Sequence, residues 1–125
     1  MKMSKKKTIL LVEDDESFRT SLKRLFKKEA LGILEAASGK EGMDLLSREK
    51  IDLILLDFYL GDMTGFDFLG LTRARSRPPV IVLTAFGDHA IQSDVLARGA
   101  LRCLTKPVKR DELMSVVTRT LECGL

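Results

Sequence analysis

The chain has 125 residues, of which 21 are basic, 18 are acidic and 45% are hydrophobic, and its formal net charge is +3. This composition fits one soluble globular domain and excludes a disordered chain. No apolar run approaches the about 18 residues of a membrane helix, and the start lacks the apolar core of a signal peptide, so we expect a cytoplasmic protein that does not enter a membrane. The start, "MKMSKKK", supplies four of the positive charges. We interpret residues 1–7 as a basic tail and expect no direct nucleic-acid binding by the domain.

Strand-like and helix-like segments alternate along the rest of the chain. Short apolar runs predict strands at 8–12, 32–38, 51–57, 80–85 and 101–105. Apolar residues at helical spacing predict helices at 17–30, 39–50, 65–75, 88–99 and 110–123. Ser17 is the expected N-cap of the first helix, and Gly99 is the expected stop of the fourth.

This β-α unit occurs five times, and its main strands are apolar on both faces, as in parallel sheets that helices cover on either side. The pattern predicts an α/β domain over residues 8–123, with a doubly wound five-stranded parallel sheet as the middle of three layers.

Polar residues follow the strands at the edge where functional sites of such sheets form. Glu13 and Asp14 follow the first strand, Asp57 ends the third, Thr84 ends the fourth, and Lys106 follows the fifth. The clustered acids repel one another, so we expect a cation among them, and ligands that are all oxygens suit Mg²⁺. Lys106 and Thr84 could bind phosphoryl oxygens, and a carboxylate beside Mg²⁺ can accept a phosphoryl group. The residues alone therefore suggest phosphoryl chemistry on an aspartate.

Four motifs occur in this order: "ILLVEDDE", "DLILLDFYLGDMTG", "VIVLTA" and "LTKP". Together they make the chain similar, over nearly all of its length, to the receiver domain of bacterial two-component response regulators. The resemblance implies a flavodoxin-like (βα)5 fold and identifies Asp57 as the phosphoacceptor. It also implies a Mg²⁺ site formed by Glu13, Asp14, Asp57 and the backbone carbonyl of Tyr59.

The resemblance gives roles to three further residues. Thr84 is the hydroxyl that follows the phosphoryl group on activation, Lys106 pairs with the acceptor or its phosphate, and the peptide bond before Pro107 is expected to be cis. Such a domain catalyses its own phosphorylation and slow dephosphorylation, but it is not a turnover enzyme.

Several positions depart from the pattern of the family or could modulate it. Cys103 stands where the family commonly has Tyr or Phe, so it cannot form the usual coupling of Thr84 to an aromatic ring. Gly61 replaces a usual proline, which predicts a looser loop after the acceptor. Tyr59 and Phe86 flank the expected phosphoryl site and could shield it from water, or they could simply cover the loops with apolar surface.

Other acids near the site have simpler interpretations. We expect Asp15 and Glu16 to begin the first helix, where acids favour the positive end of the helix dipole. We expect Asp62 and Asp67 to face solvent or to cap the next helix.

The first functional hypothesis is a switch that accepts phosphate from a histidine kinase or phosphotransfer protein. Its output would pass to an effector domain beyond residue 125 or to a partner, and the last two helices and the fifth strand would offer a surface for homodimerisation. One alternative is a Mg²⁺-dependent phosphohydrolase with an Asp nucleophile, but Tyr59 occupies the position of its usual general acid. Another is an interaction module that works without phosphorylation.

Overall fold

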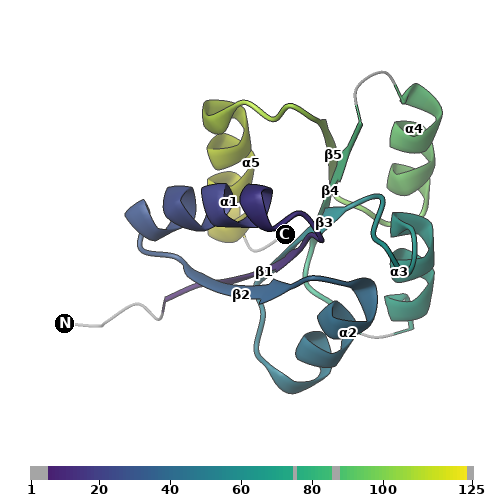
Figure 1. The fold of residues 1–125 in the computed structure, drawn as a ribbon, viewed down its shortest axis with the longest axis horizontal. Helices are drawn as coiled ribbons and strands as arrows, with labels where there is room; N and C mark the ends of the chain where they lie inside the picture. Colours follow the sequence, from purple (N-terminus) through teal and green to yellow (C-terminus); the bar gives the residue numbers. More distant parts are fainter. Residues whose placement is uncertain (1–5, 75, 86–87, 124–125) are drawn as a thin grey trace.

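The computed structural model describes residues 6–74, 76–85 and 88–123. Within these residues, five strands and five helices alternate along the chain (Figure 1). The strands are β1 (Thr8–Val12), β2 (Gly32–Ala36), β3 (Leu53–Asp57), β4 (Val80–Thr84) and β5 (Arg102–Thr105). The helices are α1 (Glu16–Lys28), α2 (Gly39–Arg48), α3 (Gly65–Thr72), α4 (His89–Ala97) and α5 (Arg110–Cys123).

The strands form one parallel sheet in the order β2-β1-β3-β4-β5. All residues of β3 and β4 are buried, as expected for strands in the middle of a covered sheet, whereas β2 is only half-buried at one edge. The chain therefore winds in both directions from β1, and the predicted doubly wound, flavodoxin-like fold is confirmed.

Helices cover both faces of the sheet: α1 and α5 lie on one face, and α2, α3 and α4 lie on the other (Figure 1). Alternate residues of each strand enter two separate cores. Leu10 and Ile54 belong to the core under α2, α3 and α4, whereas Ile9 and Leu55 belong to the core with Phe26 of α1. The strand ends that carry the polar residues are thus held between two packed layers.

The helix ends agree in part with the sequence prediction. Helix α1 begins one residue earlier than expected, and its N-cap is Asp15, whose side chain accepts a hydrogen bond from Phe18 N at 3.3 Å. Ser17 was the wrong choice, because it already lies inside the first turn. Gly99 has the positive φ of 105° that ends α4, as predicted. Helix α3 ends at Thr72, before the predicted residue 75, which lies outside the described residues.

None of the helices in the described part of the chain is both long and apolar enough to cross a membrane.

Candidate functional site

Three carboxylates meet at the edge of the sheet where β1 and β3 end. One carboxylate oxygen from each of Glu13, Asp14 and Asp57 lies within 4.8 Å of the others. Glu13 and Asp57 are buried, with 1% and 8% of their surface exposed, whereas Asp14 faces solvent. Because β1 and β3 are hydrogen-bonded neighbours, the sheet itself brings these acids together.

Lys106 provides the positive charge that the acidic cluster needs. Its Nζ lies 3.0 Å from Glu13 Oε1 and 2.9 Å from Asp57 Oδ1. Its backbone N–H donates to the carbonyl of Thr84 at 2.7 Å, which fixes the end of β5 against β4. The Lys106–Pro107 peptide bond is cis. The sequence predicted a metal ion as the answer to the repulsion, but in this structure a lysine already balances part of it.

Burial governs how these groups ionise. It raises the pKa of Glu13 and of Asp57 above their ordinary values, more than the hydrogen bonds from Lys106 lower them. Burial alone would lower the pKa of Lys106, but its hydrogen bonds to Asp57 and Glu13 outweigh burial and leave that pKa raised. The site thus favours a charged lysine and disfavours a full set of ionised acids.

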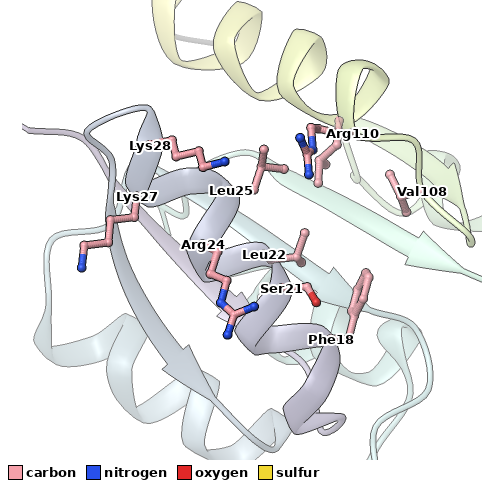
Figure 2. A pocket seen from close by; sticks show the side chains of 10 residues that line it. Phe18, Ser21, Leu22, Arg24, Leu25, Lys27, Lys28, Val108 and Arg110 are labelled. Carbon is pink, nitrogen blue, oxygen red and sulfur yellow. The ribbon is translucent and has the colours of Figure 1, made fainter.

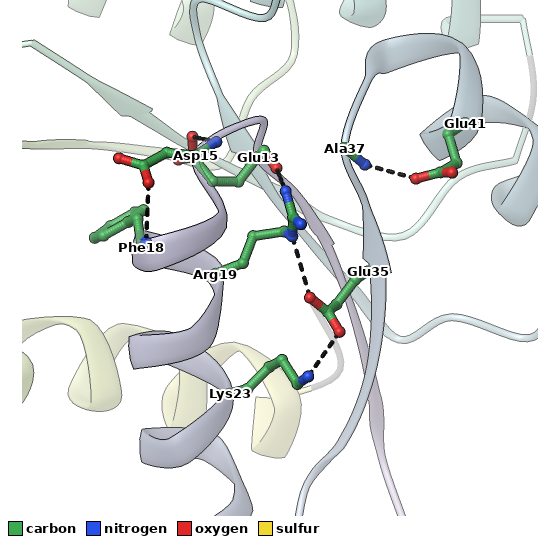
Figure 3. A network of polar contacts seen from close by, with 8 residues as sticks. All are labelled: Glu13, Asp15, Phe18, Arg19, Lys23, Glu35, Ala37 and Glu41. Carbon is green, nitrogen blue, oxygen red and sulfur yellow. Dashed lines mark hydrogen bonds and ion pairs between the residues drawn. The ribbon is translucent and has the colours of Figure 1, made fainter.

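A chain of polar contacts from α1 to β2 holds Glu13 in place (Figure 3). Its Oε2 accepts a hydrogen bond from Asp15 N at 3.0 Å, and its carbonyl accepts one from Arg19 Nη1 at 2.7 Å. Arg19 Nε also donates to Glu35 at 3.1 Å, and Lys23 lies 2.8 Å from the same carboxylate. The lysine and arginine lower the pKa of Glu35. Arg19 was not singled out in the sequence, because a basic residue on a helix carries no motif.

Thr84 lies at the end of β4 with 1% of its surface exposed. Among the residues that the structure describes, its hydroxyl Oγ1 has no hydrogen-bond partner. A buried hydroxyl without a partner costs about 1–3 kcal/mol of stability. A hydroxyl in this position can donate a hydrogen bond to an acceptor that reaches the end of β4.

The loop between β3 and α3 carries the expected site residue Tyr59 and also Asp62, and Asp67 lies in the first turn of α3. The Tyr59 side chain is 55% exposed, and its ring meets the edge of the Phe58 ring at a centroid distance of 4.8 Å. Phe58 is itself buried, so Tyr59 lies on the solvent side of this contact, and its suggested shielding role stays a prediction. Asp67 forms a capping box with Thr64 at the start of α3, as predicted for a cap of the next helix. Asp62 is exposed, as predicted, and its carboxylate also accepts hydrogen bonds from Gly39 N and Lys40 N in the first turn of α2.

Cys103 is half-buried and packs against the core under α2, α3 and α4. Burial raises the pKa of its thiol, and the nearby charge of Asp88 adds to this. Two residues further along β5, Thr105 Oγ1 accepts a hydrogen bond from Gln92 Nε2 of α4 at 3.2 Å. No sequence pattern predicts this direct hydrogen bond between α4 and β5. Phe86, the second suggested shielding residue, lies outside the described residues.

A groove of about 760 Å³ lies between α1 and α5. Figure 2 shows that Phe18, Leu22 and Leu25 of α1 line it on one side, and Val108 and Arg110 line it on the other. The Phe18 ring also lies under Lys106, whose Nζ is 4.6 Å from its centroid. The groove therefore begins at the wall of the acidic site.

The arrangement suits phosphoryl chemistry. The three carboxylates could hold a metal ion, and oxygen ligands without His or Cys favour a hard cation. Asp57 Oδ1 lies beside the Lys106 ammonium group, and the buried hydroxyl of Thr84 ends the neighbouring strand. A nucleophilic carboxylate, a point charge and a hydroxyl donor are thus gathered at one edge of the sheet.

Comparisons with known proteins point the same way. A family model described as the response regulator receiver domain matches residues 9–118. The chain is 34% identical over 115 residues to the transcriptional regulatory protein GlrR of Escherichia coli, covering 91% of this chain and 26% of that protein. It is 35% identical over 116 residues to the transcriptional regulatory protein YvrH of Bacillus subtilis, covering 92% of this chain and 49% of that protein. The chain thus spans about half or less of the length of these relatives.

Solved structures share the fold. The signal receiver domain of a putative Luxo repressor protein from Vibrio parahaemolyticus matches with a TM-score of 0.90 and 31% identity, covering 95% of this chain and 92% of that chain. A CheY-like response regulator receiver domain protein from Methanospirillum hungatei matches with a TM-score of 0.88 and 27% identity, covering 96% and 97%.

Proposed function

The chain belongs to the response regulator receiver family, and we propose that it is a phosphorylation-controlled switch whose phosphoacceptor is Asp57. The observation that carries this proposal is the contact of Asp57 with Lys106 at 2.9 Å, beside two further acids. The neighbouring strand ends in the buried hydroxyl of Thr84, which has no hydrogen-bond partner among the described residues. We take residues 8–123 as the receiver domain and residues 1–7 as a tail. The chain is not a classical enzyme, although we propose that it catalyses its own phosphorylation and slow dephosphorylation.

The proposed reaction is transfer of a phosphoryl group to the Asp57 carboxylate. A carboxylate oxygen forms a bond to phosphorus while the bond from phosphorus to the donor breaks, and the electron pair of that bond leaves with the donor. With phosphohistidine as donor, the imidazole nitrogen keeps the electron pair and takes up a proton. Lys106 then exchanges its contact with the carboxylate for one with a phosphoryl oxygen, and Thr84 donates its hydroxyl to another.

We propose Mg²⁺ as the cofactor. Glu13, Asp14, Asp57 and the backbone carbonyl of Tyr59 would hold it, since they offer the oxygen ligands that Mg²⁺ prefers. When bound, the ion would neutralise charge on the transferred phosphoryl group. Glu13 already uses both carboxylate oxygens, one toward Lys106 and one toward Asp15 N. This supports a role for Glu13 through water and a direct one for Asp14.

The proposed phosphodonor is a sensor histidine kinase or a phosphotransfer protein. The groove between α1 and α5 offers such a partner an apolar wall beside the site, with Lys28 and Arg110 at its edge. The proposed output is an effector domain beyond residue 125 or a separate partner, with homodimerisation through α4, β5 and α5 as a further possibility. The cytoplasm is the proposed compartment.

Labelling with a small donor tests the assignment of Asp57. Acetyl phosphate with Mg²⁺ should add one acid-labile phosphoryl group, detected by mass spectrometry of the intact chain. Asp57→Asn keeps the side-chain shape but removes the nucleophile, so it should take up none. Undiminished labelling of this variant would contradict the assignment, whereas Asp14→Ala should slow labelling without moving it to another residue.

A further inference from the structure

The loop that connects β3 to α3 begins beside the acidic site, and its tip contacts helix α2. At its tip, Asp62 Oδ1 accepts a hydrogen bond from Gly39 N at 2.9 Å, and Oδ2 accepts one from Lys40 N at 3.0 Å. Both donors belong to the first turn of α2, whose free N–H groups need acceptors. These two amides lower the pKa of Asp62, so the carboxylate is charged at neutral pH. One side chain thus joins the loop to α2.

Packing reinforces this link. The next residue, Met63, lies so close to Gly39 that a Cβ at Gly39 would fall 2.4–2.7 Å from its side chain. Helix α2 is itself held firmly, because a Cβ at Gly42 would meet Val12 of β1 at 2.9 Å. The loop tip is therefore fixed to an element that packs directly on the sheet.

The base of the loop is also closed. Gly65 N donates to the carbonyl of Phe58 at 2.7 Å, and Leu60 N donates to the carbonyl of Met63 at 3.0 Å. Tyr59 lies opposite Thr64 in this short ladder, and its own peptide oxygen is not used by either of the two bonds. The carbonyl of Tyr59 is thus held between β3 on one side and the anchored tip on the other.

Gly61 explains why the loop needs such an anchor. A glycine adds backbone freedom where the family usually has a proline, and no heavy atom lies within 4 Å of a Cβ built at this position. The sequence therefore predicted a looser loop. The contacts of Asp62 and Met63 with α2 supply the restraint that the backbone of Gly61 does not.

We propose that Asp62 is a positioning residue for the metal site, which acts by anchoring the Tyr59 carbonyl through α2. The proposal rests on the proposed function, since that function makes this carbonyl a Mg²⁺ ligand. Without Asp62, the loop samples more conformations, and the carbonyl must be ordered when the ion binds. Groups that orient metal ligands typically change metal affinity about tenfold or more when they are removed.

The test is a Mg²⁺ titration of the full chain in which the fluorescence of Tyr59 reports binding. This residue is the only tyrosine in a chain without tryptophan, so the signal comes from the loop itself. In Asp62→Ala we expect the dissociation constant for Mg²⁺ to rise about tenfold. Circular dichroism should show an unchanged fold, because Asp62 is exposed. The rise in melting temperature with Mg²⁺ gives a second measure of the same affinity.

Glu41→Gln is the matched control. Glu41 lies in the same turn of α2, and its replacement by glutamine removes the same charge as Asp62→Ala does. Its side chain accepts a hydrogen bond from Ala37 N and not from the β3–α3 loop. It should change the dissociation constant by less than about twofold, since an exposed charge acts weakly at a distance. Equal weakening in Asp62→Ala and Glu41→Gln would overturn the proposal, because charge alone would then explain the effect.

A rescue experiment separates loop order from other effects of Asp62. Proline at position 61 fixes φ, and the open space there accepts a larger residue. Adding Gly61→Pro to Asp62→Ala should restore most of the lost Mg²⁺ affinity, and failure to restore any would contradict the mechanism. A wild-type chain without any response to Mg²⁺ would refute the metal site itself, whereas wild-type binding with normal binding by Asp62→Ala would refute only the role of Asp62.

Discussion

Replacing Asp57 with asparagine should stabilise the fold when no divalent ion is present. The acidic cluster places one oxygen of Asp57 within 4.8 Å of oxygens of both Glu13 and Asp14. At an effective dielectric constant of 20, a charged pair at that distance limit repels by at least about 3.5 kcal/mol. Lys106 attracts Asp57 across 2.9 Å by about 6 kcal/mol on the same scale. The two repulsions therefore roughly cancel the one attraction.

The burial of Asp57 then decides whether the substitution raises or lowers the free energy of unfolding. Asp57 is 8% exposed, and the cost of burying its charge raises its pKa above the ordinary value of 3.8. The folded state therefore disfavours the charged carboxylate, and Asp57→Asn removes that charge while keeping the shape. We expect a gain on the order of 1 kcal/mol, a typical size for relief of strain at a functional site. For a chain of this length, that gain raises the melting temperature by about 4 °C.

The dependence on pH follows from the same shift. Because the folded pKa of Asp57 is raised, the folded chain takes up the proton at a higher pH than the unfolded chain does. Wild type should thus gain stability relative to the Asp57→Asn variant as the pH falls from the raised pKa toward the unfolded value. The advantage of the variant is fully present above the raised pKa of Asp57 and should shrink as the pH falls through that pKa.

Urea unfolding in EDTA at pH 7 and at acidic pH measures both effects. Asp44→Asn, on the exposed face of α2, is the control for net charge and should change stability little. Saturating Mg²⁺ should reduce or reverse the advantage of Asp57→Asn, because the ion then stabilises the wild type through this carboxylate. An Asp57→Asn variant that is less stable than wild type in EDTA at pH 7 would refute the reasoning and show that the ion pair with Lys106 outweighs burial.

Four further predictions concern the metal, the output, the partner and the phosphate. Mg²⁺ should raise the melting temperature of wild type more than that of Asp14→Ala, and equal stabilisation would move the metal site elsewhere. A phosphate mimic should cause small NMR chemical-shift changes in α4 and β5 of wild type and larger changes in Cys103→Tyr; the reverse order would refute our interpretation of Cys103. Lys28→Glu should slow phosphotransfer from a kinase that phosphorylates wild type, while labelling by acetyl phosphate stays unchanged; equal slowing of both would exclude a docking role. Tyr59→Asn should open a path for water and speed loss of the phosphoryl group up to about tenfold, a barrier change of about 1.4 kcal/mol, and unchanged decay would end the shielding hypothesis.

The sequence could predict the fold because the apolar residues of each strand show whether its faces are buried. An uninterrupted apolar run such as 53–56, bounded by acids at 52 and 57, fits a covered parallel strand and little else. Element ends were less certain. Asp15 and Ser17 are both good N-caps, and only the extended backbone of Asp15 in the structure decides between them.

The site was predictable where a residue ends a strand and unpredictable where it reaches across the fold. Asp57 and Lys106 follow their strands directly, so the topology of the sheet alone brings them to one edge. Asp62 contacts α2 from 22 or 23 residues away in sequence, and Arg19 joins Glu13 to β2. Such contacts depend on how helices are placed on the sheet, and a local sequence pattern does not record that.

Cys103 can affect the output of the domain without affecting the chemistry of the phosphorylation site. The phosphoacceptor, the acids and the lysine depend on β1, β3 and the end of β5, and none of their contacts involves Cys103. A thiol lacks the size of an aromatic ring, so its movement alone would change little of the surface near α4. The hydrogen bond from Gln92 to Thr105 already ties α4 to β5, next to Lys106 in the chain. A shift of Thr84 toward phosphate would pull on this end of β5 through the bond from Lys106 N to the Thr84 carbonyl. These backbone and side-chain amide contacts can therefore transmit a shift of Thr84 to α4 without an aromatic switch. We expect the movement of α4 to be smaller than the movement that an aromatic switch would cause.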